Sequence, residues 1–172
     1  MALLPTILHP DPVLRKRAEP VTEITPDILK LLDDMLETMY DAPGIGLAAP
    51  QVSISKRLVV IDIEGRDGKG DTAYKMINPK ITAFADIKTE LEEGCLSLPD
   101  MACVVTRPEQ VTITYMDVNG KEHELNADGL LAKAIQHELD HLDGKLIFDY
   151  LSPIKRDITL RRYLKMLKKE GL

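Results

Sequence analysis

The sequence predicts an α+β fold with a largely antiparallel sheet, one helix before the strands and two after them. Three observations predict it. One helical pattern comes first, several strand-like runs follow, and two helical patterns complete the chain. An Asn-Gly pair separates two of the runs, which is typical of a hairpin and therefore of antiparallel strands. Helices and strands that occupy separate parts of the chain favour this class over alternating β-α-β units.

The first helix is expected to begin after Thr25, a suitable cap, with Pro26 in its first turn and Pro43-Gly44 beyond its end. Strand-like runs follow at residues 57–63, 76–84, 111–118 and 121–125, and Asn119-Gly120 joins the last two. Between the limits of the first helix, apolar residues recur with the spacing of one helix face: Ile28, Leu31, Leu32, Met35, Leu36, Met39 and Tyr40.

Two later helices complete the pattern. The central one should begin near Asn126 or Asp128 and end at Gly144, which suits a C-terminal cap. The last, from about Pro153 to Lys169, is basic. Residues 153–172 contain seven Lys or Arg against two acidic residues, a net charge of +5. Because the whole chain carries −6, residues 1–152 carry −11.

Length and composition indicate one globular domain over residues 1–172, with a basic C-terminal helix at 153–170. The N-terminus lacks the basic residues of a secretion signal, and no apolar stretch is long enough to cross a bilayer. Two cysteines are too few for a disulfide framework. We therefore expect a cytoplasmic protein without membrane contact, whose acidic body disfavours DNA.

The central helix carries a candidate metal-binding motif, because residues 136–141 read Gln-His-Glu-Leu-Asp-His. His137 and His141 are four residues apart and share one helix face, so both imidazoles can reach one ion while Glu138 lies beside it. Metal-assisted hydrolysis needs such nitrogen ligands and a carboxylate near the water molecule. The alternative interpretation is a solvated helix with two chance histidines.

A catalytic metal site needs a third protein ligand, and the two familiar sources of one after His141 both fail. A metzincin would have a histidine where this chain has Ile147. The one later glutamate, Glu170, lies two residues from the end of the sequence. The third ligand is therefore expected upstream of the histidine pair.

Three upstream residues are candidates: His9, His123 and Cys95. Cys95 is favoured, because Gly94 lets the backbone come close to a partner and a thiolate is a strong ligand. His9 lies in a proline-rich segment and His123 on a polar strand, where solvation is the simpler interpretation. Cys103 lies in an apolar run and fits the core instead.

A second candidate segment, residues 43–51, has two glycines and two alanines and ends at Gln51. It lacks the Gly-Lys-Ser/Thr ending of a phosphate loop. Its small residues allow close approach by another backbone, and the Gln51 amide is an uncharged donor suited to an oxyanion. A tight turn with packed alanines is the alternative.

Three segments together resemble the motifs of the peptide deformylase family. They read Gly-Ile-Gly-Leu-Ala-Ala-Pro-Gln at 44–51, Glu-Gly-Cys-Leu-Ser at 93–97 and Gln-His-Glu-Leu-Asp-His-Leu-Asp-Gly at 136–144. The resemblance covers essentially the whole chain, and it implies largely antiparallel β-sheets packed around a central metal-binding helix, with an N-terminal and a C-terminal helix. It implies a metal-dependent hydrolase that removes the formyl group from the N-terminal formylmethionine of newly made polypeptides and releases formate.

The resemblance also implies roles for individual residues. It implies a divalent metal held by Cys95, His137 and His141, natively ferrous iron, with zinc or nickel able to substitute; the ligand types alone would favour zinc. By the same resemblance, Glu138 is the general acid/base. The Gln51 amide and the Leu96 backbone N–H donate hydrogen bonds to the oxyanion. The backbone groups of Ile45, Gly46 and Gly94 bind the peptide.

Two positions depart from the family pattern. Lys133, four residues before His137, stands where relatives often place an apolar residue that lines the methionine pocket. Ala102 stands where many relatives have an arginine thought to help hold the peptide. We expect Lys133 at the rim of the pocket, with its stem over apolar surface and its ammonium in solvent.

The basic tail and the overall function each have alternatives. The tail is either an amphipathic helix docked on the body or a contact for ribosomal RNA, where nascent substrates emerge. The function could instead be that of a zinc metallopeptidase, or of a catalytically silent binding homologue. Ile147 in place of a histidine and the lack of a suitably placed later glutamate oppose the first, and intact Gln51, Cys95 and Glu138 oppose the second.

Overall fold

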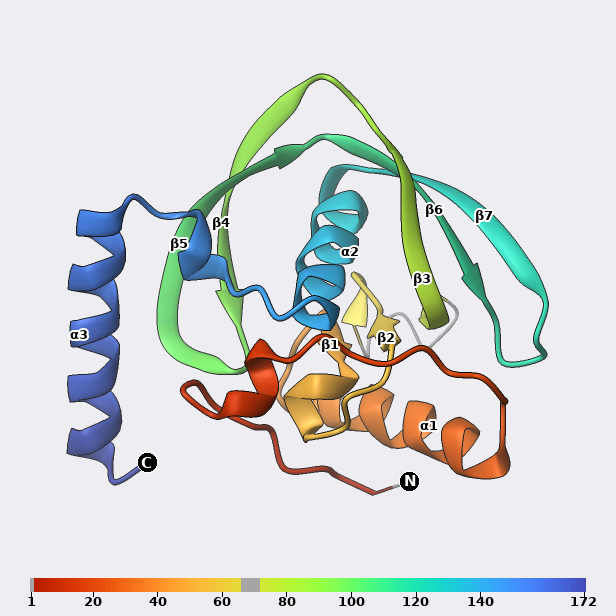
Figure 1. The fold of residues 1–172 in the computed structure, drawn as a ribbon, viewed down its shortest axis with the longest axis horizontal. Coiled ribbons are helices and arrows are strands. Elements are labelled where there is room, and N and C mark those ends of the chain that lie inside the picture. The colour runs from red at the N-terminus through yellow and green to blue at the C-terminus, as the bar shows by residue number, and fades with distance from the viewer. Residues whose placement is uncertain (1, 66–71) are drawn as a thin grey trace.

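The computed structural model describes residues 2–65 and 72–172, and its helices and antiparallel sheets confirm the predicted α+β class (Figure 1). The helices are α1 (Pro26–Asp41), α2 (Gly129–Leu142) and α3 (Pro153–Glu170), with short 3-10 turns η1 (Pro12–Arg15), η2 (Ala49–Val52) and η4 (Ile147–Tyr150). The strands are β1 (Gly46–Ala48), β2 (Leu58–Ile61), β3 (Tyr74–Phe84), β4 (Lys88–Cys95), β5 (Leu98–Pro108), β6 (Gln110–Met116) and β7 (Glu122–Asp128).

The strands form two sheets, and α2 lies between them (Figure 1). Five strands pair in the order β1-β2-β3-β6-β7, while β4 and β5 form a separate hairpin, and every pair is antiparallel. The four predicted strand runs correspond to β2, β3, β6 and β7. Strand β1 and the β4–β5 hairpin were not predicted from the sequence.

Helix α1 begins and ends where the sequence predicts. The Thr25 hydroxyl oxygen accepts a hydrogen bond from the Ile28 N–H at 3.3 Å, which satisfies one of the free donors of the first turn. The apolar face of the helix packs against β1 and β2. Burial of each such large side chain stabilises the fold by about 1.5–3 kcal/mol. The buried apolar residues of this face are Ile28, Leu32, Met35 and Met39.

Helix α2 is buried around most of its circumference, which is unusual for a helix with two histidines and a glutamate. Gly144 follows its C-terminal end with a φ of +75°. A Cβ atom there would lie 2.5 Å from the carbonyl oxygen of Arg15, so both the backbone angle and the space require glycine. This confirms the glycine as the C-terminal signal of the helix.

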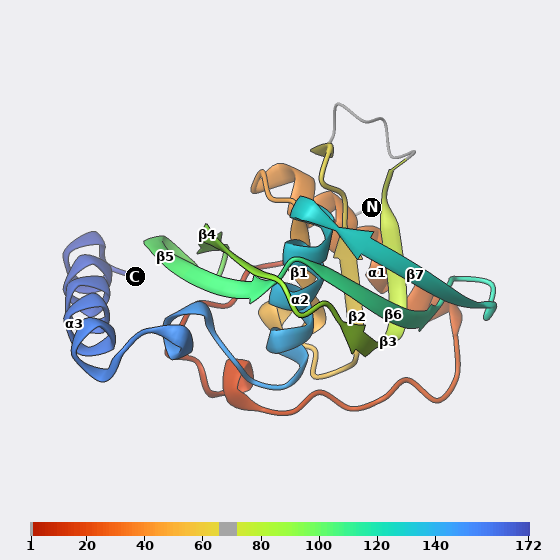
Figure 2. The same cartoon turned by 90° about the horizontal axis from the view of Figure 1, so that it is seen from above.

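Helix α3 lies on the outer side of the β4–β5 hairpin (Figure 2) and contacts β5 and η4. Tyr163 and Leu167 are buried, and the Tyr163 hydroxyl donates to the carbonyl oxygen of His9 at 2.9 Å. The helix is therefore docked on the body, while its exposed surface carries basic side chains together with Ile154, Ile158 and Leu164. In the described part of the chain, no helix combines the length and the apolar character that a membrane span needs.

Candidate metal centre

The two sheets and α2 bring three potential metal ligands together. Cys95 ends β4, while His137 and His141 face it from α2. The His141 Nε2 atom lies 3.3 Å from the Cys95 Sγ and 3.3 Å from the His137 Nε2. All three ligand atoms lie within 4.8 Å of one another, and they are the one such group among the described residues.

Two of the three separations between these atoms can be compared with those of a tetrahedral ion. Ligands about 2.0–2.3 Å from such an ion stand roughly 3.3–3.8 Å apart. The two observed separations of 3.3 Å fall at the lower end of this range. A thiolate with two imidazoles leaves one of four positions open, which is the arrangement of a catalytic rather than a structural site.

The other ligand candidates lie elsewhere. The His9 ring packs edge-on against Phe148 at 5.0 Å, and His123 pairs with Asp117 at 2.6 Å. Cys103 is buried in the core beneath the hairpin, as its apolar surroundings predict. Cys95 is therefore the third member of the set.

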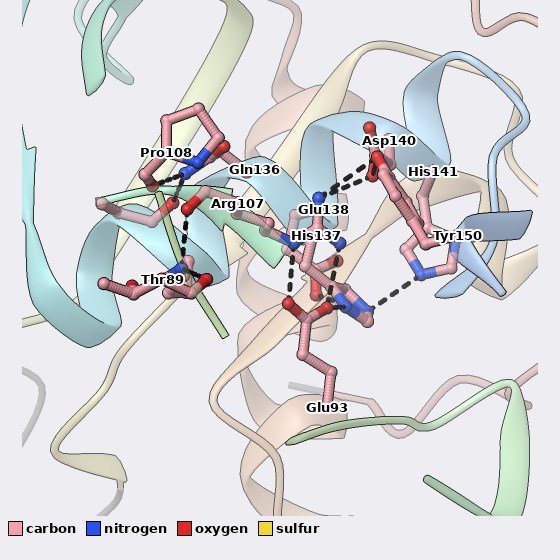
Figure 3. A network of polar contacts seen from close by, with 12 residues as sticks. Thr89, Glu93, Arg107, Pro108, Gln136, His137, Glu138, Asp140, His141 and Tyr150 are labelled. Atoms are coloured by element: carbon pink, nitrogen blue, oxygen red, sulfur yellow. Dashed lines mark hydrogen bonds and ion pairs between the residues drawn. The ribbon is translucent and has the colours of Figure 1, made fainter. Parts of the chain in front are cut away.

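A chain of buried charges orients the first histidine (Figure 3). The Nδ1 atom of His137 lies 2.9 Å from Glu93, and Arg107 donates to both carboxylate oxygens of Glu93 at 2.7 and 2.9 Å. Arg107 also donates to Asp140 at 2.8 Å. This network fixes the ring so that Nε2 faces the ligand point. No role for Glu93, Arg107 or Asp140 was predicted from the sequence.

Glu138 is buried beside the ligands, with its Oε1 3.8 Å from the His137 Nε2. Burial raises the pKa of Glu138 to about 7, although the charge of His137 opposes the rise. A carboxyl group with such a pKa can hold or release a proton near neutral pH. The position agrees with the expected general acid/base, and Gly46 in β1 provides the space for it, since a Cβ there would lie 2.8 Å from Oε1.

Gln51 is fixed with its amide group toward the metal centre. Its Oε1 accepts from the Ala48 N–H at 2.9 Å, so the NH₂ group must point the other way. That group lies 3.5 Å from the Cys95 Sγ and 3.2 Å from the Ser97 hydroxyl. Leu96 directly follows Cys95, in the turn between β4 and β5.

A cavity of about 430 Å³ opens beside these groups, between the loop before β1, the hairpin and α2. Ala102 is exposed and does not line it. The walls combine apolar side chains with the polar groups of the metal centre. The expected substrate-binding residues all line it: Ile45, Gly46, Gly94 and Lys133.

The expectation for the ammonium of Lys133 is wrong. The residue is only 5% exposed, and its Nζ donates to the carbonyl oxygens of Thr89 at 2.6 Å and Arg107 at 2.9 Å. The ammonium is therefore held inside the protein, where two main-chain acceptors replace water. Lysine is rarely buried, and these carbonyl partners on a distant hairpin have no sequence signal.

Comparisons with known proteins agree with this site. The family model described as Polypeptide deformylase matches residues 4–157. The chain belongs to the peptide deformylase family. The peptide deformylase of Rhizobium meliloti is 49% identical over 99% of this chain and 98% of its own length. That of Thermodesulfovibrio yellowstonii is also 49% identical, over 95% and 98% of the two chains.

Solved peptide deformylases share the fold. The structure from Legionella pneumophila has a TM-score of 0.91 and 44% identity, and covers 99% of this chain and 98% of its own. The one from Ehrlichia chaffeensis in complex with actinonin has a TM-score of 0.90 and 39% identity, with full coverage of both. The family and the Cys-His-His site identify a metal-dependent hydrolase that removes the N-formyl group from nascent polypeptides.

Proposed function

We propose that residues 1–172 act as one catalytic domain, in which Cys95, His137 and His141 hold the ion and neighbouring groups divide the work of hydrolysis. The observation that carries the proposal is the convergence of these three ligand atoms beside a buried carboxylate. When bound, the ion supplies the Lewis acidity that makes a water molecule nucleophilic near neutral pH. We propose ferrous iron as the native ion, with zinc or nickel able to substitute, since thiolate and imidazole suit all three.

Glu138 moves the proton in this proposal. Its carboxylate takes a proton from the attacking water and delivers it to the methionine nitrogen as the bond to the formyl carbon breaks. The side chain is well placed because it is 4% exposed and Gly46 leaves it room. Its rigid burial keeps the carboxylate oriented between the two transfers.

Gln51 and Leu96 stabilise the negative charge that develops on the formyl oxygen. The Gln51 NH₂ group points toward Cys95, and the backbone N–H of Leu96 adjoins that ligand in sequence. Removal of one such donor typically lowers kcat about 100- to 1,000-fold. Gln51→Ala should therefore lose activity while it retains its metal, and Glu138→Gln should behave likewise. Loss of metal together with activity in both variants would contradict these roles.

The peptide is proposed to bind in extended form along strand edges. Strand β1 is an edge of the five-stranded sheet and β4 pairs with β5 alone, so both offer main-chain groups to the cavity. Ile45 and Gly46 lie at the first edge and Gly94 at the second. A substrate in extended conformation between these edges forms main-chain hydrogen bonds, which do not depend on the side chains that follow methionine.

We propose that α3 guides the enzyme to its substrate in the cytoplasm by contact with ribosomal RNA. The family model ends at residue 157, so most of this helix lies beyond it. Three basic side chains, Arg161, Arg162 and Lys165, are exposed. Phosphate contacts by such residues weaken as salt rises.

Charge reversal tests this contact better than truncation, because Tyr163 and Leu167 are part of the core. Substitution of Arg161, Arg162 and Lys165 by Glu should reduce ribosome binding and flatten its salt dependence by about one unit of log–log slope per lost phosphate contact. Activity on short formyl peptides provides the control for folding. Ribosome binding equal to wild type would refute the proposal.

A further inference from the structure

Lys133 joins α2 to both strands of the β4–β5 hairpin. Its ammonium donates to Thr89 of β4 and to Arg107 of β5, and these two residues lie opposite each other in the hairpin register. Glu93, the nearby carboxylate, is already bound by Arg107 and His137. The ammonium is therefore held by neutral main-chain acceptors and not by an ion pair.

One N–H of this ammonium has no acceptor among the described residues. A lysine ammonium has three N–H groups, and in the described residues two acceptors are found for the Lys133 Nζ. Lys133 lines the cavity and is the one Lys or Arg among the described residues that do so. A buried donor that lacks an acceptor is costly. Because Lys133 lines the cavity, a substrate bound there can supply the acceptor that the protein does not provide.

We propose that Lys133 lets the cavity accept, as the first side chain of the formyl peptide, an unbranched side chain that ends in a hydrogen-bond acceptor. The specific case is methionine sulfoxide, in addition to methionine. The proposal rests on the proposed function of the same site. Leu91 and Leu130 line the same cavity as Lys133 and provide the apolar surface that methionine needs. The free N–H of the ammonium then donates to the sulfoxide oxygen.

The chemistry of the sulfoxide explains why a lysine matters here. Oxidation keeps the length of the methionine side chain but makes its end polar. An apolar pocket would bury that oxygen without a partner, which lowers binding by about 10- to 100-fold. A donor inside the wall removes this penalty. Formylated chains whose first methionine has been oxidised would then remain substrates.

The test compares three formyl peptides that differ only in the first side chain: methionine, methionine sulfoxide and norleucine, which matches the length without an acceptor. We measure kcat/KM for each with wild type and with Lys133→Met, which keeps the stem and removes the donors. The expected result is a wild-type sulfoxide value within about 10-fold of methionine. The sulfoxide-to-norleucine ratio should fall by about 10-fold or more in the variant.

Two controls keep the outcome clear. Lys80→Met, an exposed lysine of β3, should leave the sulfoxide-to-norleucine ratio unchanged. Lys133→Arg keeps N–H donors and should retain most of the ratio, even if Lys133→Met folds poorly. An unchanged ratio in Lys133→Met, or a wild-type preference for methionine over the sulfoxide above about 100-fold, would overturn the proposal. Failure to hydrolyse even the formylmethionine peptide would instead refute the proposed function.

Discussion

Gly46→Ala should damage the enzyme by displacing Glu138. A Cβ at residue 46 would lie 2.8 Å from the Glu138 Oε1 and 3.0 Å from its Cγ, whereas ordinary contacts begin at 3.4 Å. The two groups must therefore separate by about 0.6 Å. The φ of Gly46 is not among the positive values, so the backbone itself tolerates alanine.

The magnitude follows from the burial of both partners. Gly46 is buried in β1, and Glu138 is 4% exposed, so neither can relax into solvent. Overpacking of this kind costs about 1–3 kcal/mol of stability. A displacement of 1 Å at a reacting group can cost about 100-fold in rate, so a shift of about 0.6 Å should lower kcat by roughly 10-fold or more.

A double-mutant cycle isolates the clash. The free energies of unfolding of wild type, Gly46→Ala, Glu138→Ala and the double variant are measured by chemical denaturation with the same bound metal. Because Glu138→Ala removes the atoms that the new Cβ meets, Gly46→Ala should cost little in that background, with a coupling of about 1–2 kcal/mol. An equal cost of Gly46→Ala in both backgrounds would refute the reasoning.

Two further predictions concern the buried charges. Arg107→Met should destabilise the fold by about 3–5 kcal/mol, because Glu93 would keep a buried charge without its partner. Chemical denaturation should show that adding Glu93→Gln restores part of the lost free energy of unfolding, and no such gain would contradict this. Burial raises the pKa of Asp149, but hydrogen bonds from Arg15 and the Leu146 N–H outweigh it and leave the pKa below 3.8. The stability that this carboxylate contributes is therefore present above pH 3.8 and lost as pH falls through the lowered pKa. Asp149→Asn should accordingly lower the free energy of unfolding near neutral pH and change it little in strong acid. A difference in unfolding midpoint between variant and wild type that does not depend on pH would contradict this.

The helices were predictable because local chemistry sets their ends. Thr25 caps α1, and Gly144 is required after α2 by its φ and by the Arg15 carbonyl. The metal ligands were predictable for a related reason. His137 and His141 share a helix face, and exclusion of other partners left Cys95 favoured.

The β4–β5 hairpin could not be predicted from the alternation of apolar and polar residues that is typical of a strand. The exposed part of β4 reads Lys-Thr-Glu-Leu-Glu before Glu93, a pattern without an apolar face. In β5 the buried alternation of Met101, Cys103 and Val105 continues into Arg107, where a charge takes the place of an apolar side chain. The pairing of Arg107 with Glu93 depends on tertiary contacts, as does the burial of Lys133.

The central claim is that the Cys95, His137 and His141 site, with Glu138 as its proton carrier, releases formate from formylmethionyl peptides. The most direct measurement is an anaerobic assay of formate release by the iron-loaded enzyme, with Glu138→Ala as the matched variant and metal content determined for both. We expect formate from the wild type and a loss of at least about 100-fold in the variant at equal metal content. No formate from the iron-loaded wild type, or equal rates in the two proteins, would contradict the account.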